Sequence, residues 1–264
     1  MTLQAFFVDA FTNRQFSGNQ AALIPLENWL DAPLMQSIAA EHNLAETAFF
    51  VPQGADFELR WFTPKVEVDL CGHATLAAAF VLRECLGHGA DTVRFHTRSG
   101  ELAVTWQNGW YTLDFPARPA LPVAEEDLAL RQGLGGEPVE ILAARDYLVR
   151  FRTAAEVRAL QPDFARLKQA KRFAVIATAP GEAEGIDFVS RFFAPAQGID
   201  EDPVTGSAHC TLIPYWADQL GKQTFRARQI SERGGDLRCE WRGERVAISG
   251  QAVLFAKSEI YIPG

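Results

Sequence analysis

Positive charge is scarce in this sequence. Lys and Arg together number 25 against 33 Asp and Glu, which leaves a formal net charge of −8. Nucleic acids and anionic membrane surfaces attract basic patches, and this balance of charges argues against both. We therefore expect no nucleic acid and no membrane among the partners.

Long apolar runs and basic N-terminal residues are also missing. No apolar stretch approaches the roughly 18 residues that a membrane-spanning helix requires. The opening residues MTLQAFFVDAF contain no basic segment and reach Asp9 too early for a secretory signal peptide. The sequence predicts a cytoplasmic protein.

Cysteine is sparse and widely spaced. The chain has no CxxC motif, and its four cysteines are Cys71, Cys85, Cys210 and Cys239. In a chain of this length, such spacing predicts free thiols and no disulfide framework.

The remaining composition is that of a globular protein. The 264 residues are 48% hydrophobic and 22% charged, enough for one large domain or for two of about 130 residues. Short strand-like segments separated by turn residues predominate. Two stretches, 32–44 and 73–87, have the pattern of helices, and the Pro-, Glu- and Gly-rich stretch 118–140 reads as a connection.

The second half of the chain repeats features of the first. At an offset of 131, residues Phe57, Arg60, Phe62 and Pro64 match Phe188, Arg191, Phe193 and Pro195; at an offset of 134, Gly72-His73-Ala74 matches Gly206-Ser207-Ala208. We infer an internal duplication and predict an α+β fold of two pseudo-symmetric domains. Their bounds are 1–118 and 119–250, with a last strand at about 251–264 returning to the first.

Both repeats place a glycine just before a predicted helix. A glycine there lets backbone N–H groups approach a ligand, and the positive end of the helix attracts an anion. The alternative is that Gly72 and Gly206 only form turns, with Ser207 as an ordinary N-cap. Because the pattern occurs twice, we predict that a carboxylate is held between Gly72-His73 and Gly206-Ser207, in a cleft between the domains.

Glu46 is a candidate acid or base. It stands where the helical stretch 32–44 turns into the apolar segment TAFFV, and a carboxylate at the edge of a buried strand needs a partner. The alternative is a solvent-exposed glutamate in a turn.

Cys71 and His73 allow several chemistries. His73 could relay a proton or donate a hydrogen bond. A zinc site built from Cys71, His73, His209 and Cys210 lacks ligand spacing, and a cysteine hydrolase lacks a nucleophile signature, so we expect no metal and no cysteine nucleophile of that kind.

Asp202 is the third candidate. It belongs to the segment GIDEDPVTGSAH, which reads as an acidic loop leading to the second helix start. Pro203 fixes the backbone directly after Asp202, so Asp202 is the carboxylate we expect to point into the cleft.

Four stretches together resemble a known family. FSGNQAAL (16–23), NLAETAFF (43–50), VDLCGHATLAAA (68–79) and DEDPVTGSAH (200–209) are similar to signature segments of the PhzF-like family of phenazine biosynthesis, in order and over nearly the whole chain. The resemblance implies the diaminopimelate-epimerase-like fold, in which each domain is a mainly antiparallel sheet around a central helix.

The resemblance also implies roles for particular residues. Glu46 would shuttle a proton, with His73 and Asp202 as further catalytic residues and no cofactor or metal. Asn19, Gly72, Gly206 and Ser207 would bind the substrate. Related epimerases use two cysteines; Cys71 occupies about the place of the first, whereas Pro203 stands near the place of the second, so a two-thiol mechanism is not expected.

The sequence thus predicts a cofactor-independent isomerase that transfers a proton on a small carboxylate-bearing molecule, and a homodimer. One alternative is an amino-acid epimerase or racemase that uses Cys71 with a second base that is not a thiol. Another is a catalytically silent small-molecule binding protein. The identity of the substrate is not predicted.

Overall fold

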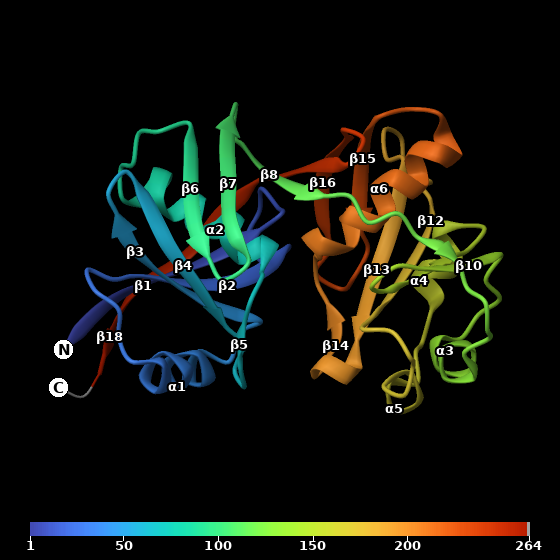
Figure 1. Cartoon of the computed structure of the whole chain (residues 1–264), viewed down its shortest axis with the longest axis horizontal. Coiled ribbons are helices and arrows are strands. Elements are labelled where there is room, and N and C mark those ends of the chain that lie inside the picture. Colours follow the sequence, from blue (N-terminus) through green and yellow to red (C-terminus); the bar gives the residue numbers. More distant parts are fainter. Residues whose placement is uncertain (263–264) are drawn as a thin grey trace. The chain divides into compact units, whose positions relative to one another are not determined.

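The structure, a computed structural model, describes residues 1–262 and divides into two compact units (Figure 1). One unit comprises Met1–Asp114 together with the C-terminal segment that begins at Ser249. The other comprises Phe115–Ile248. The chain therefore leaves the first unit, builds the second without interruption, and returns. Within residues 1–262, no helix is both long enough and apolar enough to cross a membrane.

The first unit is a mixed sheet with two helices. Its strands are β1 (Thr2–Ala10), β2 (Asn19–Pro25), β3 (Glu46–Gln53), β4 (Asp56–Phe62), β5 (Glu67–Val68), β6 (Thr92–Thr97), β7 (Gly100–Gln107), β8 (Trp110–Pro116) and β18 (Ala252–Tyr261). The strands pair in the order β18-β1-β2-β3-β4-β6-β7-β8, with parallel pairs at β2/β3 and β4/β6 and antiparallel pairs elsewhere. The short β5 forms a hairpin with β4.

Helix α2 (Gly72–Phe80) is the centre of this unit. Seven of its nine residues are buried, and the helix contacts β1, β2, β3 and β7. Its sequence GHATLAAAF is rich in alanine, and such small side chains allow a sheet to pack closely around a helix that is buried on all sides. A wider helical turn, η1 (Val81–Cys85), continues it, and α1 (Ala32–His42) packs on the outside through Met35 and Ile38.

The second unit has a comparable sheet. Its strands are β9 (Leu121–Pro122), β10 (Glu140–Ala143), β11 (Tyr147–Arg150), β12 (Val175–Pro180), β13 (Phe188–Ala194), β14 (Ile199–Asp202), β15 (Thr224–Gln229), β16 (Gly235–Trp241) and β17 (Arg245–Gly250). Helix α6 (Gly206–Leu220) is its central helix, with eleven of fifteen residues buried. The short helices α3 (Leu128–Leu134), α4 (Ala154–Ala159), α5 (Phe164–Leu167) and η2 (Pro195–Gln197) complete it.

The same succession of strand pairings occurs in both units. Antiparallel β1/β2, parallel β2/β3, antiparallel β3/β4 and parallel β4/β6 correspond to antiparallel β10/β11, parallel β11/β12, antiparallel β12/β13 and parallel β13/β15. The hairpins that precede the central helices share one equivalent pair, Trp61 facing Val68 in one and Phe192 facing Asp202 in the other, and the register of the second hairpin shifts between Phe192 and Ala194. The predicted α+β fold, with a mainly antiparallel sheet around a central helix in each unit, is confirmed.

A matched ion pair fastens each of these hairpins. Arg60 binds Glu67 through two parallel hydrogen bonds of 2.7 and 2.9 Å. Arg191 binds Glu201 through two bonds of 2.8 Å. Each arginine also lies over a phenylalanine two residues further along its strand, Phe62 or Phe193. The pairs hold β5 and β14 at the points where the chain enters the central helices.

The structure corrects three local predictions. The acidic segment around Asp202 is a strand, β14, because Arg191 neutralises Glu201 across the hairpin and allows extended pairing. The stretch 118–140 contains a capped helix, α3, whose N-terminal N–H groups are bound by Asp127. The helix expected over 73–87 begins at Gly72, and after Phe80 it continues as the wider turn η1.

Candidate active site

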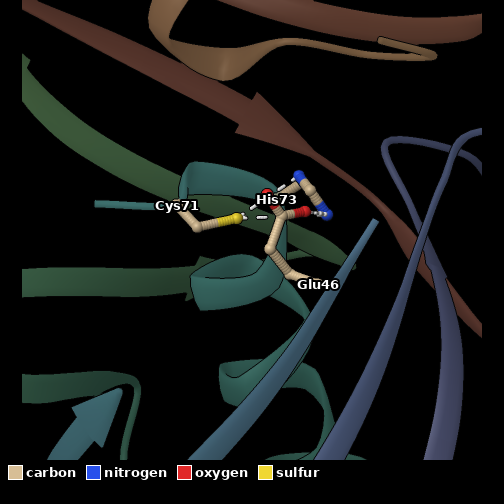
Figure 2. A group of neighbouring side chains, drawn as sticks. All are labelled: Glu46, Cys71 and His73. Atoms are coloured by element: carbon tan, nitrogen blue, oxygen red, sulfur yellow. Dashed lines mark hydrogen bonds and ion pairs between the residues drawn. The ribbon is translucent and has the colours of Figure 1, made fainter. Parts of the chain in front are cut away.

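Glu46 is the first residue of β3 and lies beside β2, with Ala21 as its neighbour in register. Helix α1 ends just before it, at Asn43 in the left-handed conformation, and the chain then turns directly into the strand. The Glu46 side chain is only 11% exposed, and its Oε2 lies 3.0 Å from Nε2 of His73 (Figure 2). The alternative of a solvent-exposed glutamate is wrong.

His73 is the second residue of α2 and is buried. One ring nitrogen, Nε2, faces Glu46, and the other, Nδ1, lies 3.2 Å from the amide nitrogen of Asn19. Asn19 is completely buried at the start of β2. The preceding Gly18 has a φ of 71°, and a Cβ there would lie 2.2 Å from the Ala10 carbonyl oxygen. Only glycine fits that turn, which is how the GNQ segment presents Asn19 to the ring.

Cys71 immediately precedes α2 and is also buried. Its Sγ lies 3.5 Å from Nδ1 of His73, and Figure 2 shows the Glu46 and Cys71 side chains beside the imidazole of His73. Burial raises the pKa of Cys71, the nearby Glu46 carboxylate raises it further, and the contribution of His73 is smaller and opposite. The Cys71 side chain is therefore a neutral thiol at neutral pH, which makes it a poor base.

The pKa of His73 is raised well above its usual value. Burial alone would lower it, but the neighbouring Cys71 and Glu46 outweigh burial. Since burial keeps Cys71 as a thiol, we attribute the net effect to the Glu46 carboxylate. The Asn19 amide can donate to a neutral ring or, after rotation by 180°, accept from a charged one. This position can therefore hold His73 in either protonation state, as a proton relay requires.

The same three side chains contain the atoms that a metal ion would need. One ligand atom from each of Glu46, Cys71 and His73 lies within 4.8 Å of the others. Carboxylate, thiolate and imidazole ligands form a set that zinc accepts. Binding would require Cys71 to lose its proton, which burial opposes. The expectation of a metal-free site stays a prediction.

In the second unit, Asp202 ends β14 and is half-buried. Its Oδ2 accepts a hydrogen bond from the hydroxyl of Thr205, the residue that precedes α6. Gln229, which is completely buried in β15, accepts from the Thr205 backbone N–H at 2.8 Å and donates to the Asp202 carbonyl at 2.7 Å. This one side chain fixes the loop between Asp202 and the helix.

Gly206 and Ser207 are the first two residues of α6. The Ser207 hydroxyl lies 3.4 Å from Nη2 of Arg145, and the guanidinium of Arg145 is held by two bonds of 3.0 Å to the buried Asp146. A helix N-terminus, a hydroxyl and a guanidinium are all groups that attract a carboxylate.

Sequence reasoning missed Thr205, Gln229 and Arg145. Gln229 follows the alternation of an ordinary strand, TFRARQ, and Arg145 lies in a turn far from any motif, so neither carries a local signal. Thr205 lies inside the quoted segment DEDPVTGSAH but was not singled out. The structure does bring together the predicted residues Glu46, His73 and Asn19 in the first unit, and Asp202, Gly206 and Ser207 in the second.

Comparison with known proteins defines the class. A solved structure described as a predicted epimerase from Pseudomonas aeruginosa superimposes with a TM-score of 0.76 at 20% identity, covering 99% of this chain and 100% of that one. This likeness shows the fold alone, and it agrees with the predicted epimerase-like architecture. Together with the strand pairings described above, it defines an α+β protein of epimerase-like fold.

Closer relatives identify the family. An uncharacterized isomerase of P. aeruginosa is 52% identical over 261 residues, covering 98% of this chain and 99% of the relative. A PhzF-family phenazine biosynthesis protein from Enterococcus faecalis superimposes with a TM-score of 0.94 at 45% identity, covering 99% of this chain and 100% of that one. The profile of the phenazine biosynthesis-like proteins, PhzC-PhzF, matches residues 8–258. The chain belongs to this PhzF-like family, and the prediction that it is an enzyme of the isomerase class is confirmed.

Proposed function

We propose that the protein is a cofactor-independent isomerase that moves a proton within a small carboxylate-bearing substrate, with Glu46 as the group that removes and returns it. The observation that carries the proposal is the 3.0 Å contact between Glu46 Oε2 and His73 Nε2, in surroundings nearly closed to water.

The chemistry requires one group in two states. Glu46 as a carboxylate takes a proton from a substrate carbon, the electron pair of that C–H bond shifts into the substrate, and Glu46 as a carboxylic acid then donates the proton to a second carbon. His73 holds the carboxylate in place through the 3.0 Å contact of its Nε2. His73 touches Glu46 directly, which suits a proton relay.

The other predicted residues would bind the substrate. Ser207 and the N-terminal N–H groups of α6 beginning at Gly206 suit a carboxylate, and Arg145 adds a positive charge beside Ser207. Asp202, held by Thr205, suits a substrate amine or hydroxyl. Asn19 and Gly72 would complete the surroundings of His73. The expectation that residues of both units act on one substrate stays a prediction.

An epimerase that uses Cys71 is the second candidate. It is favoured by one observation, the 3.5 Å distance between Cys71 Sγ and Nδ1 of His73, because an imidazole can accept a thiol proton. The raised pKa of the buried thiol makes this candidate the weaker one.

The test is transfer of solvent deuterium into a substrate. The purified protein is incubated in D₂O with a panel of cyclic and acyclic amino acids and hydroxy acids, and exchange at carbon is followed by NMR. With the substrate so found, Glu46→Gln is expected to lower turnover about 10²–10⁴-fold, since Gln keeps the size and one acceptor but cannot carry the proton. Glu41→Gln, a change at an exposed glutamate five residues earlier, is the matched control and keeps full activity.

Further variants separate the roles. Asp202→Asn and His73→Ala are expected to fall between Glu46→Gln and the wild type, as groups that position or relay. If Glu46→Gln exchanges deuterium at the wild-type rate while Cys71→Ala does not, the thiol mechanism replaces the proposed one.

A further inference from the structure

Strand β18 is a long edge with one neighbour. Among residues 1–262, its backbone pairing runs along β1 from Thr2–Tyr261 to Ala10–Ala252, and no other strand contacts it extensively. None of its ten residues is buried. An exposed strand edge of this length offers a row of backbone donors and acceptors and normally pairs with something or is blocked.

The hydrogen bonds show which groups face outward. Met1 and Ile262 exchange both of their backbone bonds, N–H to C=O in each direction. In antiparallel pairing the bonded residues alternate, so Ile260 and Ser258 also direct their backbone groups toward β1. Lys257, Glu259 and Tyr261 therefore direct their N–H and C=O groups away from β1, to the outer edge. Near the other end, at Leu254, the side chain of Gln15 already binds the carbonyl.

The exposed side chains of the strand form a symmetrical row. Phe255, Lys257, Glu259 and Tyr261 alternate with less exposed residues, so an aromatic residue stands at each end and opposite charges stand in the middle. Phe255 and Tyr261 are 50% and 80% exposed, and Phe255 is joined by Phe16, which is 73% exposed and packs edge-on against it. A two-fold rotation about Ser258 therefore places the row antiparallel to its own copy, with each aromatic residue facing an aromatic residue and each charge facing the opposite charge.

We propose that β18 pairs antiparallel with β18 of a second copy of this chain, about a two-fold axis at Ser258. Lys257 then lies opposite Glu259 of the partner subunit, and Phe255 lies opposite Tyr261 of the partner subunit. A two-fold interface is isologous, so each contact occurs twice. This pairing would be the interface of the homodimer that the sequence predicts.

Charge selects this register over its neighbours. Residues whose backbone groups face the outer edge must pair with residues of the same kind in the partner strand. One β18 strand can therefore slide along the other only by two residues at a time, and each such step moves the two-fold axis by one residue. An axis at Lys257 places that lysine against its own copy, and an axis at Glu259 does the same for the glutamate. Like charges directly opposite each other are unfavourable, whereas Lys against Glu is favourable. Of these three registers, only the axis at Ser258 joins opposite charges.

The test is charge reversal followed by analytical ultracentrifugation of the full chain. We expect the wild type to be a dimer, and Lys257→Glu and Glu259→Lys each to raise the dimer dissociation constant at least about tenfold, because each creates two like-charge contacts. A mixture of the two single variants is expected to form a heterodimer, and the double variant to recover the homodimer. Lys65→Glu, at an exposed lysine elsewhere in the unit, is the control and stays dimeric.

A second readout does not depend on charge. Ser258 faces its own copy across the axis as a non-hydrogen-bonded pair, the closest pair in an antiparallel ladder, so Ser258→Cys is expected to form a disulfide-linked dimer on mild oxidation. Ser99→Cys, at an exposed serine, is expected to stay unlinked under the same conditions. A monomeric wild type, single reversals that dimerise as the wild type does, or an unlinked Ser258→Cys would each overturn the proposal.

Discussion

His73 has three polar neighbours, and each bears differently on its proton. Glu46 stabilises the imidazolium, burial opposes it, and the amide of Asn19 can serve either form. Cys71 contributes a neutral thiol, since its own pKa is raised. At the scale of single residues, the site is therefore organised around the carboxylate and the ring, with the sulfur as a small neighbour that fills the space beside Nδ1.

Removing the thiol should consequently have a mild effect. We expect Cys71→Ala to retain turnover within about tenfold of the wild type, because no proton needs to leave the sulfur in the Glu46 mechanism. Cys71→Ser, which keeps a polar atom near Nδ1, is the matched comparison and should lie closer to the wild type. Turnover is measured with the substrate found by deuterium exchange; a loss of 10²-fold or more in Cys71→Ala would reassign the base.

His209 predicts a pH dependence of stability. Burial lowers its pKa from 6.5 to about 4, although Nδ1 donates to the Thr205 carbonyl at 2.8 Å. The unfolded chain therefore binds this proton more tightly than the folded one. As the pH falls from about 6.5 to about 4, the free energy of unfolding should decrease by about 1.4 kcal/mol per pH unit through this residue. The pKa of His73 is raised in the folded state, so its effect has the opposite sign. Its contribution to the free energy of unfolding is complete below about pH 6.5 and is lost as the pH rises through the folded pKa.

The measurement is urea unfolding at pH 7 and pH 5. His209→Asn keeps an N–H donor for Thr205 and removes the titration, so the loss of stability between the two pH values should shrink relative to the wild type. Equal losses in the wild type and His209→Asn would show that His209 does not titrate as described.

At the scale of elements, the paired arginines fasten the hairpins that lead into α2 and α6. Arg191 is 13% exposed and Glu201 21%, and Arg191 also donates to the Leu160 carbonyl at 2.9 Å. We expect Arg191→Met to destabilise the protein by about 2–3 kcal/mol, because Glu201 loses its partner in a partly desolvated position. Arg94→Met removes an exposed pair with Glu101 and should cost less than about 1 kcal/mol. Urea unfolding of both variants checks the difference; equal effects would contradict it.

The contacts that hold β14 should also affect substrate binding. Asp202 is adjacent to Glu201, and Gln229 holds its carbonyl. We expect Gln229→Leu, which keeps the size but removes the bonds to the Thr205 N–H, the Thr205 hydroxyl and the Asp202 carbonyl, to raise KM more than it lowers kcat if Asp202 binds the substrate. A variant with reduced stability but unchanged KM would limit Gln229 to a structural role.

Some elements were predictable from the sequence and some were not. The two central helices and the strands β4 and β13 that precede them were predicted because the repeat displays them twice. Glu46 and His73 were candidates from their positions in the sequence, whereas Asn19 and the shared role of the three residues came from motif resemblance, because their contacts join β3, α2 and β2 and no local pattern reveals a pairing across strands. The strand β14 was read as a loop because its acidic residues look solvated until Arg191 is known to face them. Helix α4 did carry a signal, the capping box of Thr153 and Glu156, and was overlooked because it is short.

At the scale of the whole molecule, one unit is built from a single continuous stretch of the chain and the other from two separate stretches. Residues 115–248 are contiguous and contain their own apolar core, whereas β1 of the first unit depends on β18 from the far end of the chain. We expect a fragment of residues 115–248 to fold alone, and a fragment of residues 1–114 to stay partly unfolded, because Leu3 and Phe7 lose the strand beside them. Far-UV circular dichroism with urea titration checks both; cooperative unfolding of fragment 1–114 would contradict the expectation.

The return of β18 to β1 has a consequence for biosynthesis. A ribosome adds about 5–20 residues per second, so the whole of residues 115–248 is made during an interval on the order of ten seconds between the first strands of the N-terminal unit and the strand that completes its sheet. During that interval the edge of β1 is unpaired while the contiguous unit can already fold. Nascent chains on neighbouring ribosomes are then exposed to one another at β1, and a chaperone that shields this strand would protect the yield of the enzyme without touching its active site.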